Sequence, residues 1–547
     1  MFLVTSACQT QTVTTDHAIV PNIATPVGLR AGHFLAARQA GYLSDITASA
    51  NFYLTALQTD ERNPQLLQRG FVSQYRDGNI DMAAALARQL ETLNVKAPFT
   101  VEPAISQAIS VADWDAVIVL SDQLAEDITA TPLAGVIKSW ALVASGQGDS
   151  GLAHLAETGK ILAQDESSPP IFIQVQVALM AEYLGYQDEA VDTTTRLARS
   201  PTLPAKAALQ TAGILARAMQ NQTANALLSK LPYSFDRNQI DPDQLAPPAT
   251  VAEFIANAIT DAALAYRDPQ FISMMPARLQ LALYLEPEHD AARFFLAQSW
   301  IELGQFERAK FTLAKINDPG IWVLPRLLLL NDIDIRTGNL EEAIERLNTY
   351  VLEHPDNGYL LTELGDLYRR DAQYAKARDS YLQAITTGFD STNLYRNLAI
   401  SHERLGEDEE AEIYFKGALA RDPNDPFTLN YLGYWWAESG RHLTQAIELI
   451  EQAVQLRPDS GFFVDSLGWV HYQLGNYQLA VEFLEKATTL GPEDAVIIAH
   501  LGDAYWQTKR YNEAQYKWRY AAQITKDSAL QAALENKLSS GFPMMRQ

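Results

Sequence analysis

A repeat of 34 residues is the feature that most constrains how this chain can fold. Seven segments align when the sequence is shifted by this length, and they begin at Asp290, Leu324, Gly358, Thr392, Pro426, Gly461 and Ala495. One extra residue near His442 makes the fifth interval 35 residues long. Such a period indicates a series of similar supersecondary units, each of which buries its apolar face against its neighbours.

Small residues recur at two places in each unit, where a single isolated helix would need bulky apolar side chains. Glycine or alanine follows a leucine at the first place, in Gly365, Ala399, Gly433, Gly468 and Gly502. Alanine fills the second place in all seven units, as Ala309, Ala343, Ala377, Ala411, Ala446, Ala480 and Ala514. Because large side chains would overpack such places, the pattern predicts hairpins of two closely crossing helices, with Gly468 and Ala480 at one crossing.

The order of residues within each unit resembles the tetratricopeptide repeat, a helical hairpin of 34 residues. Leu-Gly, an aromatic residue, Ala, a large apolar residue and Ala follow one another, and a proline closes four units at Pro355, Pro423, Pro458 and Pro492. The resemblance implies an all-α chain that forms an α-solenoid, a right-handed superhelix of about 13–14 stacked hairpins.

Degenerate copies of the same pattern extend toward the N-terminus, where Gly78, Trp114 and Gly185 occupy repeat positions. We therefore divide the chain into a flexible tether at 1–28, a divergent array at 29–230, an irregular proline-rich connection at 231–250 and a second array at 251–547. The amphipathic segment 527–538 is expected to cap the open end of the second array.

Charge and hydropathy argue against nucleic-acid binding and against a membrane-spanning helix. The chain carries 42 basic and 66 acidic residues, and its formal net charge of −24 argues against nucleic acid, since phosphate binding needs a basic face. No run of 18 apolar residues occurs, so we expect no helix that spans a membrane.

Catalytic and cofactor motifs do not form coherent patterns. The stretch 146–151 matches G-x-G-x-x-G, but alanine-rich helical sequence precedes it where a nucleotide-binding fold needs a strand. We therefore expect a turn between two helices there. The nine histidines show no metal-ligand spacing, and His402 and His471 fall at core positions of their repeats. The sequence thus predicts no catalytic residue, no cofactor and no metal, and it favours a binding protein over an enzyme.

The single cysteine, Cys8, lies in the N-terminal stretch MFLVTSACQTQ. A short apolar run followed by Thr-Ser-Ala-Cys resembles the end of a bacterial lipoprotein signal, in which the cysteine is lipid-modified. The stretch departs from that pattern because only seven residues precede Cys8 and no Lys or Arg occurs before Arg30. The resemblance implies a lipid anchor at Cys8, and Gln9 after it points to the outer membrane. The alternative is a chance cysteine in a tail.

In tetratricopeptide arrays the first helix of each hairpin lines a concave groove, and certain repeat positions point into it. Carried over to this sequence, these positions give a candidate lining of four arginines and four aromatic residues: Arg369, Arg370, Arg396, Arg404, Tyr434, Trp469, Tyr472 and Trp506. Such a lining suits a protein or peptide partner that carries carboxylates beside apolar side chains. The alternative is that the arginines pair with acids such as Asp366 and Glu403 and that the rings pack between repeats.

The segment Asn430–Trp518 resembles the C-terminal repeats of a group of proteobacterial outer-membrane tetratricopeptide lipoproteins. It contains NYLGYWWAESG, SGFFVDSLGWVHYQLGNYQLAVEFLEKATTL and AHLGDAYWQTKRYNEAQYKW. One member of that group is an adaptor that binds a periplasmic carboxyl-terminal processing protease and presents cell-wall hydrolases to it. The resemblance implies a non-catalytic adaptor on the periplasmic side of the outer membrane, attached only through its lipid. An assembly scaffold for envelope or secretion machinery and a cytoplasmic regulatory subunit are the alternatives.

Overall fold

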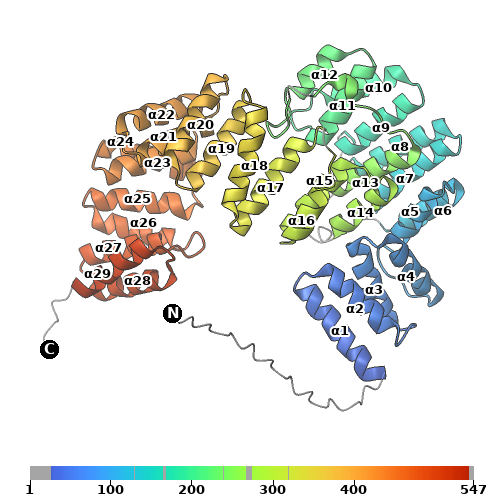
Figure 1. The fold of residues 1–547 in the computed structure, drawn as a ribbon, viewed down its shortest axis with the longest axis horizontal. Coiled ribbons are helices and arrows are strands. Elements are labelled where there is room, and N and C mark those ends of the chain that lie inside the picture. Colours follow the sequence, from blue (N-terminus) through green and yellow to red (C-terminus); the bar gives the residue numbers. More distant parts are fainter. Residues whose placement is uncertain are drawn as a thin grey trace, which may run out of the picture. The chain divides into compact units, whose positions relative to one another are not determined.

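The computed structural model describes residues 26–127, 130–163, 168–237, 240–265, 274–317 and 320–540. Over these residues the chain holds 29 α-helices, one 3-10 helix and no strand, so the all-α prediction is confirmed (Figure 1). No helix within them is both long and apolar enough to cross a bilayer. Cys8 lies outside the described residues, as does the predicted tether up to residue 25.

The chain divides into two compact units, one up to Ile333 and the other from Asp334 onward. Unit 1 contains α1 (Pro26–Tyr42), α2 (Ile46–Leu57), α3 (Pro64–Asp77), α4 (Ile80–Thr92), α5 (Val101–Ser110), α6 (Trp114–Leu124), α7 (Thr131–Ala144), α8 (Gly148–Leu162), α9 (Ile171–Tyr183), α10 (Gln187–Leu197), α11 (Ala205–Arg217), α12 (Asn221–Leu228), α13 (Val251–Ala265), α14 (Met275–Leu285), α15 (Asp290–Glu302) and α16 (Phe306–Leu313). The two units divide within α17 (Val323–Thr337).

Unit 2 continues the same succession of helices. It contains α18 (Leu340–Glu353), α19 (Gly358–Arg370), α20 (Tyr374–Thr386), α21 (Thr392–Arg404), α22 (Asp408–Arg421), α23 (Pro426–Glu438), α24 (Leu443–Leu456), α25 (Gly461–Gln473), α26 (Tyr477–Ala487), α27 (Ala495–Gln507), α28 (Tyr511–Ile524) and α29 (Ser528–Ser540). Within the two units as described, thirteen consecutive pairs pack as hairpins, from α1–α2 to α15–α16 and from α19–α20 to α27–α28. The last helix, α29, packs on α28 at the position predicted for the cap.

The 34-residue period predicts where the first helix of each hairpin begins, in most units to the exact residue. Six of the seven predicted unit starts are the first residues of α15, α19, α21, α23, α25 and α27, namely Asp290, Gly358, Thr392, Pro426, Gly461 and Ala495. The seventh, Leu324, is the second residue of α17. The period therefore reports the first helix of each hairpin directly.

Local chemistry explains where these helices begin and end. Asp425 and Ser391 precede first helices, and their side chains accept hydrogen bonds from the backbone N–H groups of Thr428 and Leu394, which caps each helix. Gly475 turns the chain after α25 with φ +78°, a left-handed conformation that glycine adopts at little cost. Gly146 has φ +81° in the predicted turn between α7 and α8, and the last four residues of the G-x-G-x-x-G stretch form the first turn of α8.

The predicted connection at 231–250 lies wholly inside unit 1. Its described residues contain one short helix, η2 (Pro242–Gln244), which packs on α11. The boundary between the compact units comes later, at Ile333, because α13 and α14 fold back onto the preceding helices of unit 1.

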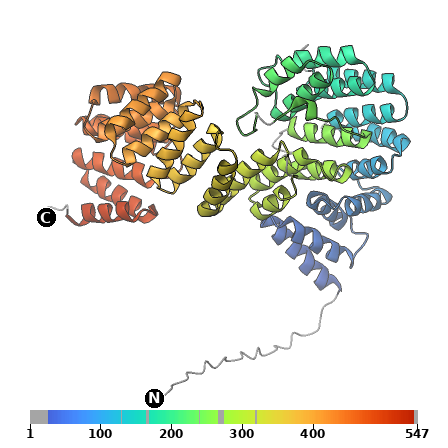
Figure 2. The same ribbon diagram turned by 45° about the horizontal axis from the view of Figure 1, so that its top comes forward.

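The hairpin α13–α14 packs against the first helices of four earlier hairpins. Helix α13 contacts α7 and α9, and α14 contacts α3 and α5 (Figures 1 and 2). The ring of Phe254 on α13 stacks on Trp140 of α7 with their centroids 4.3 Å apart. Arg278 of α14 forms a buried ion pair with Glu102 of α5 at 2.9 Å. The chain of unit 1 thus covers much of the surface that its own first helices present.

Candidate functional site

The eight residues of the predicted groove lining all lie on first helices of unit 2. Arg369 and Arg370 end α19, and the others are distributed over four further helices: Arg396 and Arg404 on α21, Tyr434 on α23, Trp469 and Tyr472 on α25, and Trp506 on α27. Helices α19, α21, α23, α25 and α27 therefore build one candidate surface, which we call the first-helix surface of unit 2.

Arg396 contributes to the structure of this surface more than to its accessible charge. Its Nη1 lies 2.7 Å from Oδ2 of Asp425, and its side chain is only 14% exposed. Asp425 also caps α23 through Thr428. Burial alone would raise the pKa of Asp425, but its hydrogen bonds with Thr428 and Arg396 outweigh that effect and lower the pKa. Arg396 therefore ties α21 to the start of the next hairpin.

The accessible cations of the surface are Arg370 and Arg404. The Arg404 side chain is 52% exposed, although its Nε lies 3.2 Å from Oε2 of Glu403, so its pairing matches the alternative drawn from the sequence. Arg370 is exposed at the end of α19. Arg369 is half-buried, 4.0 Å from Asp366. Two of the four predicted arginines thus offer a charge that a partner can reach.

The aromatic residues of the surface form contacts between and within hairpins. Trp469 lies between two rings, with its centroid 4.7 Å from that of Tyr472 and 4.0 Å from that of His500. Because His500 belongs to α27, this stack joins two repeats, and Nδ1 of His500 lies 3.0 Å from Asp465. Trp506 packs on Trp518 of its own hairpin, with centroids 5.3 Å apart. All of the predicted rings remain half-buried, so each keeps an accessible part.

A row of exposed apolar residues was missed by the sequence prediction. Phe427, Phe462 and Val496 are the second residues of α23, α25 and α27, and their exposed fractions are 52%, 59% and 44%. They occupy one register position of the 34-residue period, so aligning the units by that position would have revealed them. Isolated exposed apolar residues are common on protein surfaces, and it is the recurrence of these three at one repeat position that distinguishes them.

The first-helix surface of unit 1 differs because α13 and α14 cover part of it. Tyr75 donates a hydrogen bond to Glu102, which also pairs with Arg278. Lys206 of α11 pairs with Asp261 of α13 at 2.6 Å, and both side chains are buried. Such pairs are costly to separate, because removing one partner leaves a charge in a place that water does not reach.

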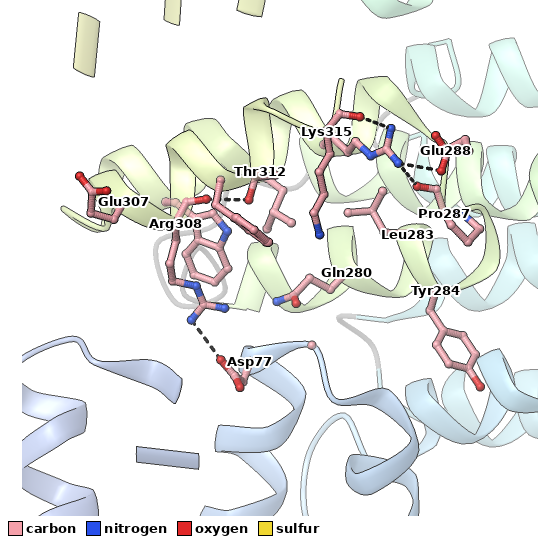
Figure 3. A pocket seen from close by; sticks show the side chains of 15 residues that line it. Asp77, Gln280, Leu283, Tyr284, Pro287, Glu288, Glu307, Arg308, Thr312 and Lys315 are labelled. Carbon is pink, nitrogen blue, oxygen red and sulfur yellow. Dashed lines mark hydrogen bonds and ion pairs between the residues drawn. The ribbon is translucent and has the colours of Figure 1, made fainter. Parts of the chain in front are cut away.

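A groove of about 990 Å³ lies at the edge of this packing, between the α3–α4 turn and helices α14, α15 and α16 (Figure 3). Arg308 points to Asp77 at 3.1 Å and lies over the ring of Trp300. Arg293 pairs with Glu288 and donates to two backbone carbonyls. Most charged groups of this groove are therefore paired with one another, which favours a structural junction over a ligand site.

The two histidines expected in the core are there. His402 is buried and stacks on Tyr414 with centroids 5.1 Å apart, and His471 stacks on Phe483 at 5.4 Å. Among the residues that the structure describes, no group of three or more His, Cys, Asp or Glu side chains is placed to hold a metal ion.

Comparison with known proteins identifies the repeat. Residues 332–393 and 437–495 match one family model described as tetratricopeptide repeat, and residues 394–427 match another with the same description. The TPR repeat-containing protein PA4667 of Pseudomonas aeruginosa is 30% identical over 188 residues, which are 34% of this chain and 32% of that protein. The chain therefore spans about a third of the length of this relative. Residues 332–427 and 437–495 are thus tetratricopeptide repeats, as the period predicted.

Other proteins match a smaller part of this chain, or match it at lower sequence identity. The photosystem I assembly protein Ycf3 of Synechococcus sp. is 30% identical over 118 residues, which are 19% of this chain and 67% of that protein. Among solved structures, the APC/C hetero-tetramer Cut9-Hcn1 covers 93% of this chain and 96% of its own, with a TM-score of 0.40 and 15% identity. PilF of Pseudomonas aeruginosa covers 34% and 83%, with a TM-score of 0.30 and 22% identity.

Proposed function

We propose that this tetratricopeptide-repeat protein is a non-catalytic scaffold that binds a protein partner along the first-helix surface of unit 2. The observation that carries the proposal is the exposed row of Phe427, Phe462 and Val496 on the first helices α23, α25 and α27. The accessible cations Arg370 and Arg404 lie on the two preceding first helices of the same unit, α19 and α21. Aromatic side chains and arginines are enriched at protein interfaces, and the row supplies two phenylalanines.

The side chains of this surface define the chemistry of the partner. Arginine forms its strongest hydrogen bonds with carboxylates, and exposed rings are best covered by other apolar groups. A segment that carries carboxylates next to large apolar side chains satisfies both. The first-helix surface of unit 1 is a poorer candidate, because the hairpin α13–α14 already covers part of it.

We further propose that the scaffold is an adaptor of the bacterial envelope that serves a carboxyl-terminal processing protease. This proposal is supported by the resemblance of residues 430–518 to outer-membrane tetratricopeptide lipoproteins and by the lipoprotein-like stretch around Cys8. In it, Cys8 carries the lipid anchor on the periplasmic side of the outer membrane, and the protease and its substrates are the partners. The similarity to Ycf3, named as an assembly protein, favours an assembly scaffold as the second candidate.

Site-specific photo-crosslinking in cells tests the proposed surface. A photoreactive phenylalanine analogue replaces Phe462 on α25 and, as the matched control, Ile413, which is 65% exposed on the second helix α22. We expect a defined adduct from position 462 and none of the same mass from position 413. Equal labelling from both positions, or adducts from 413 alone, would place the interface elsewhere. Mass spectrometry of the adduct then separates a protease from an assembly partner.

Membrane fractionation tests the anchor separately. The Cys8→Ala variant, expressed from the native gene, should move from the membrane fraction to the soluble periplasm. If variant and parent fractionate alike, Cys8 is not the anchor, and the scaffold proposal for unit 2 is unaffected.

A further inference from the structure

A cavity of about 500 Å³ lies in unit 1 among α11, residues 240–248, the start of α13 and the turn between α14 and α15. Buried polar side chains form part of its wall. Nζ of Lys206 donates to Oδ1 of Asp261 at 2.6 Å and to Oδ1 of Asn257 at 3.1 Å, and Nε2 of Gln176 donates to Oδ2 of Asp261 at 3.1 Å. These contacts neutralise Lys206 and leave it no role as an anion site.

Three further side chains of this cavity hold buried polar atoms that have no hydrogen-bond partner within the described part of the protein. They are Oε1 of Gln210, Oε2 of Glu286 and Nε2 of His289. The His289 side chain is only 9% exposed, and its Nδ1 lies 3.8 Å from Oε2 of Glu286, too far for a hydrogen bond. Buried polar atoms without partners are rare in folded proteins, because each one loses its hydration.

Carboxyl groups outnumber the free cations around the cavity. Its lining holds five of them, Asp241, Glu253, Glu286, Glu288 and Asp290. Of the basic side chains in the lining, Lys206 pairs with Asp261 and Arg217 with Glu182. Glu288 and Asp290 both pair with Arg293, at 3.1 and 2.9 Å, and Glu253 accepts a backbone N–H at the start of α13. The Glu286 side chain is 24% exposed, and among the described residues its nearest ion-pair partner is His289, at 3.8 Å. The group that would complete this wall is therefore a cation with N–H donors.

We infer that the cavity binds an organic ammonium group, with Glu286 as its ion-pair partner and Gln210 and His289 as hydrogen-bond acceptors. An ammonium group has three N–H donors and no acceptor, so it can satisfy a carboxylate, an amide oxygen and a neutral imidazole nitrogen, the kinds of atom left unpartnered here. The source of the group is either a free amine or a lysine side chain of another polypeptide.

The protonation states of the two titratable groups agree with this assignment. Burial, with Lys206 and Arg293 nearby, lowers the pKa of His289 to about 3, so the ring is neutral at pH 7 and one nitrogen can accept. Burial, with Glu253 and Asp290 nearby and Lys206 opposing them, raises the pKa of Glu286 to about 7. A bound cation favours the carboxylate, so binding releases a proton near neutral pH and weakens as the pH falls.

Titration calorimetry of the full chain with three probes tests the site. The probes are n-butylammonium, Nα-acetyl-lysine methylamide and its Nε-acetylated, uncharged form. We expect the two ammonium probes to bind, up to about tenfold more tightly near pH 8 than near pH 6, and the uncharged probe not to bind. Binding of the lysine derivative alone identifies a polypeptide source, whereas preference for n-butylammonium identifies a free amine.

Two matched variants decide whether Glu286 is the ion-pair partner. Glu286→Gln preserves the shape of the side chain and should weaken ammonium binding by about tenfold or more and remove its pH dependence. Glu288→Gln, at an exposed carboxyl group beside the same cavity, should bind as the parent does. Equal binding by Glu286→Gln, binding of the uncharged probe, or no binding of any probe would overturn the assignment. Failure here leaves the proposed surface of unit 2 untouched.

Discussion

A methyl group added to Gly468 would lie 2.7 Å from Cγ of Leu484, across the crossing of α25 and α26. The same closeness recurs in other hairpins of unit 2. A Cβ atom at Gly365, Gly433 or Gly502 would lie 2.5 to 2.8 Å from the side chain of the facing helix or its backbone. These distances are shorter than carbon atoms tolerate, so the glycines of the Leu-Gly pairs allow the two helices of a hairpin to approach closely.

Gly468→Ala should therefore destabilise the array. Either Leu484 moves off its rotamer or the two helices separate, and we expect a loss of about 1–3 kcal/mol in the free energy of unfolding. Because each repeat contacts mainly its neighbours, hydrogen exchange should accelerate most in α23–α28. Gly491→Ala is the control, since a Cβ atom there meets nothing within 4 Å. Equal stability of the two variants would show that the crossing tolerates a side chain.

The helix pattern of unit 2 was predictable because its determinants are local. The start of α23 depends on Asp425 and Pro426, which are adjacent in sequence, and the turn after α25 depends on Gly475. The register also predicted that Trp469 and Tyr472 share one surface. It did not predict that Trp469 stacks on His500, because that contact depends on the angle between neighbouring repeats.

The packing of unit 1 could not be predicted from the sequence for a related reason. Glu102 and Arg278 are 176 positions apart, and nothing near either residue indicates that they pair. The sequence pattern assigned 251–287 to the second array, and it did not show that α13 and α14 fold back onto α3, α5, α7 and α9. Long-range contacts of this kind leave no periodic signal in the chain.

The buried pair Glu102–Arg278 should hold the α13–α14 hairpin in place. Arg278→Met leaves the Glu102 carboxylate buried without its cation, and we expect the free energy of unfolding of unit 1 to fall by about 3–5 kcal/mol. Arg196→Met is the control, because Arg196 pairs with Asp192 at 3.4 Å where the two side chains are 62% and 75% exposed. That change should cost less than about 1 kcal/mol. Denaturant unfolding of both variants measures the difference, and similar losses would contradict the role of the buried pair.

His289 and Glu286 should give the stability of unit 1 two pH dependences of opposite sign. The pKa of His289 falls from 6.5 to about 3 on folding, so the unfolded chain binds the extra proton between these values. Its contribution is therefore complete above pH 6.5 and is lost as the pH falls toward 3. The pKa of Glu286 rises from 4.5 to about 7, so its contribution is complete below pH 4.5 and is lost as the pH rises toward 7.

Single variants should separate these two effects between pH 4.5 and pH 6.5, the ordinary pKa values of Glu286 and His289. Relative to the parent, Glu286→Gln should gain stability as the pH rises, by at most about 1.4 kcal/mol per pH unit. His289→Gln should lose stability relative to the parent over the same range, with a slope of similar size. Chemical unfolding at several pH values measures both difference curves. Two curves of the same sign would contradict the opposed titrations.

The accessible arginines of unit 2 should control how fast a partner associates. Charge reversal at Arg370 and Arg404 replaces two attractive charges with two repulsive ones for a partner that carries carboxylates. Arg396 is left unchanged, because its pair with Asp425 supports the cap of α23 and its loss would disturb the fold. Lys416→Glu is the control, since Lys416 is 62% exposed on the second helix α22.

With the partner captured by crosslinking at position 462, association is followed at low and high salt. We expect the double variant to associate about tenfold or more slowly at low salt and to lose most of its salt dependence, while helicity and the Lys416→Glu control stay near the parent. An unchanged association rate would exclude these arginines from the interface and direct attention to the apolar row at Phe427, Phe462 and Val496.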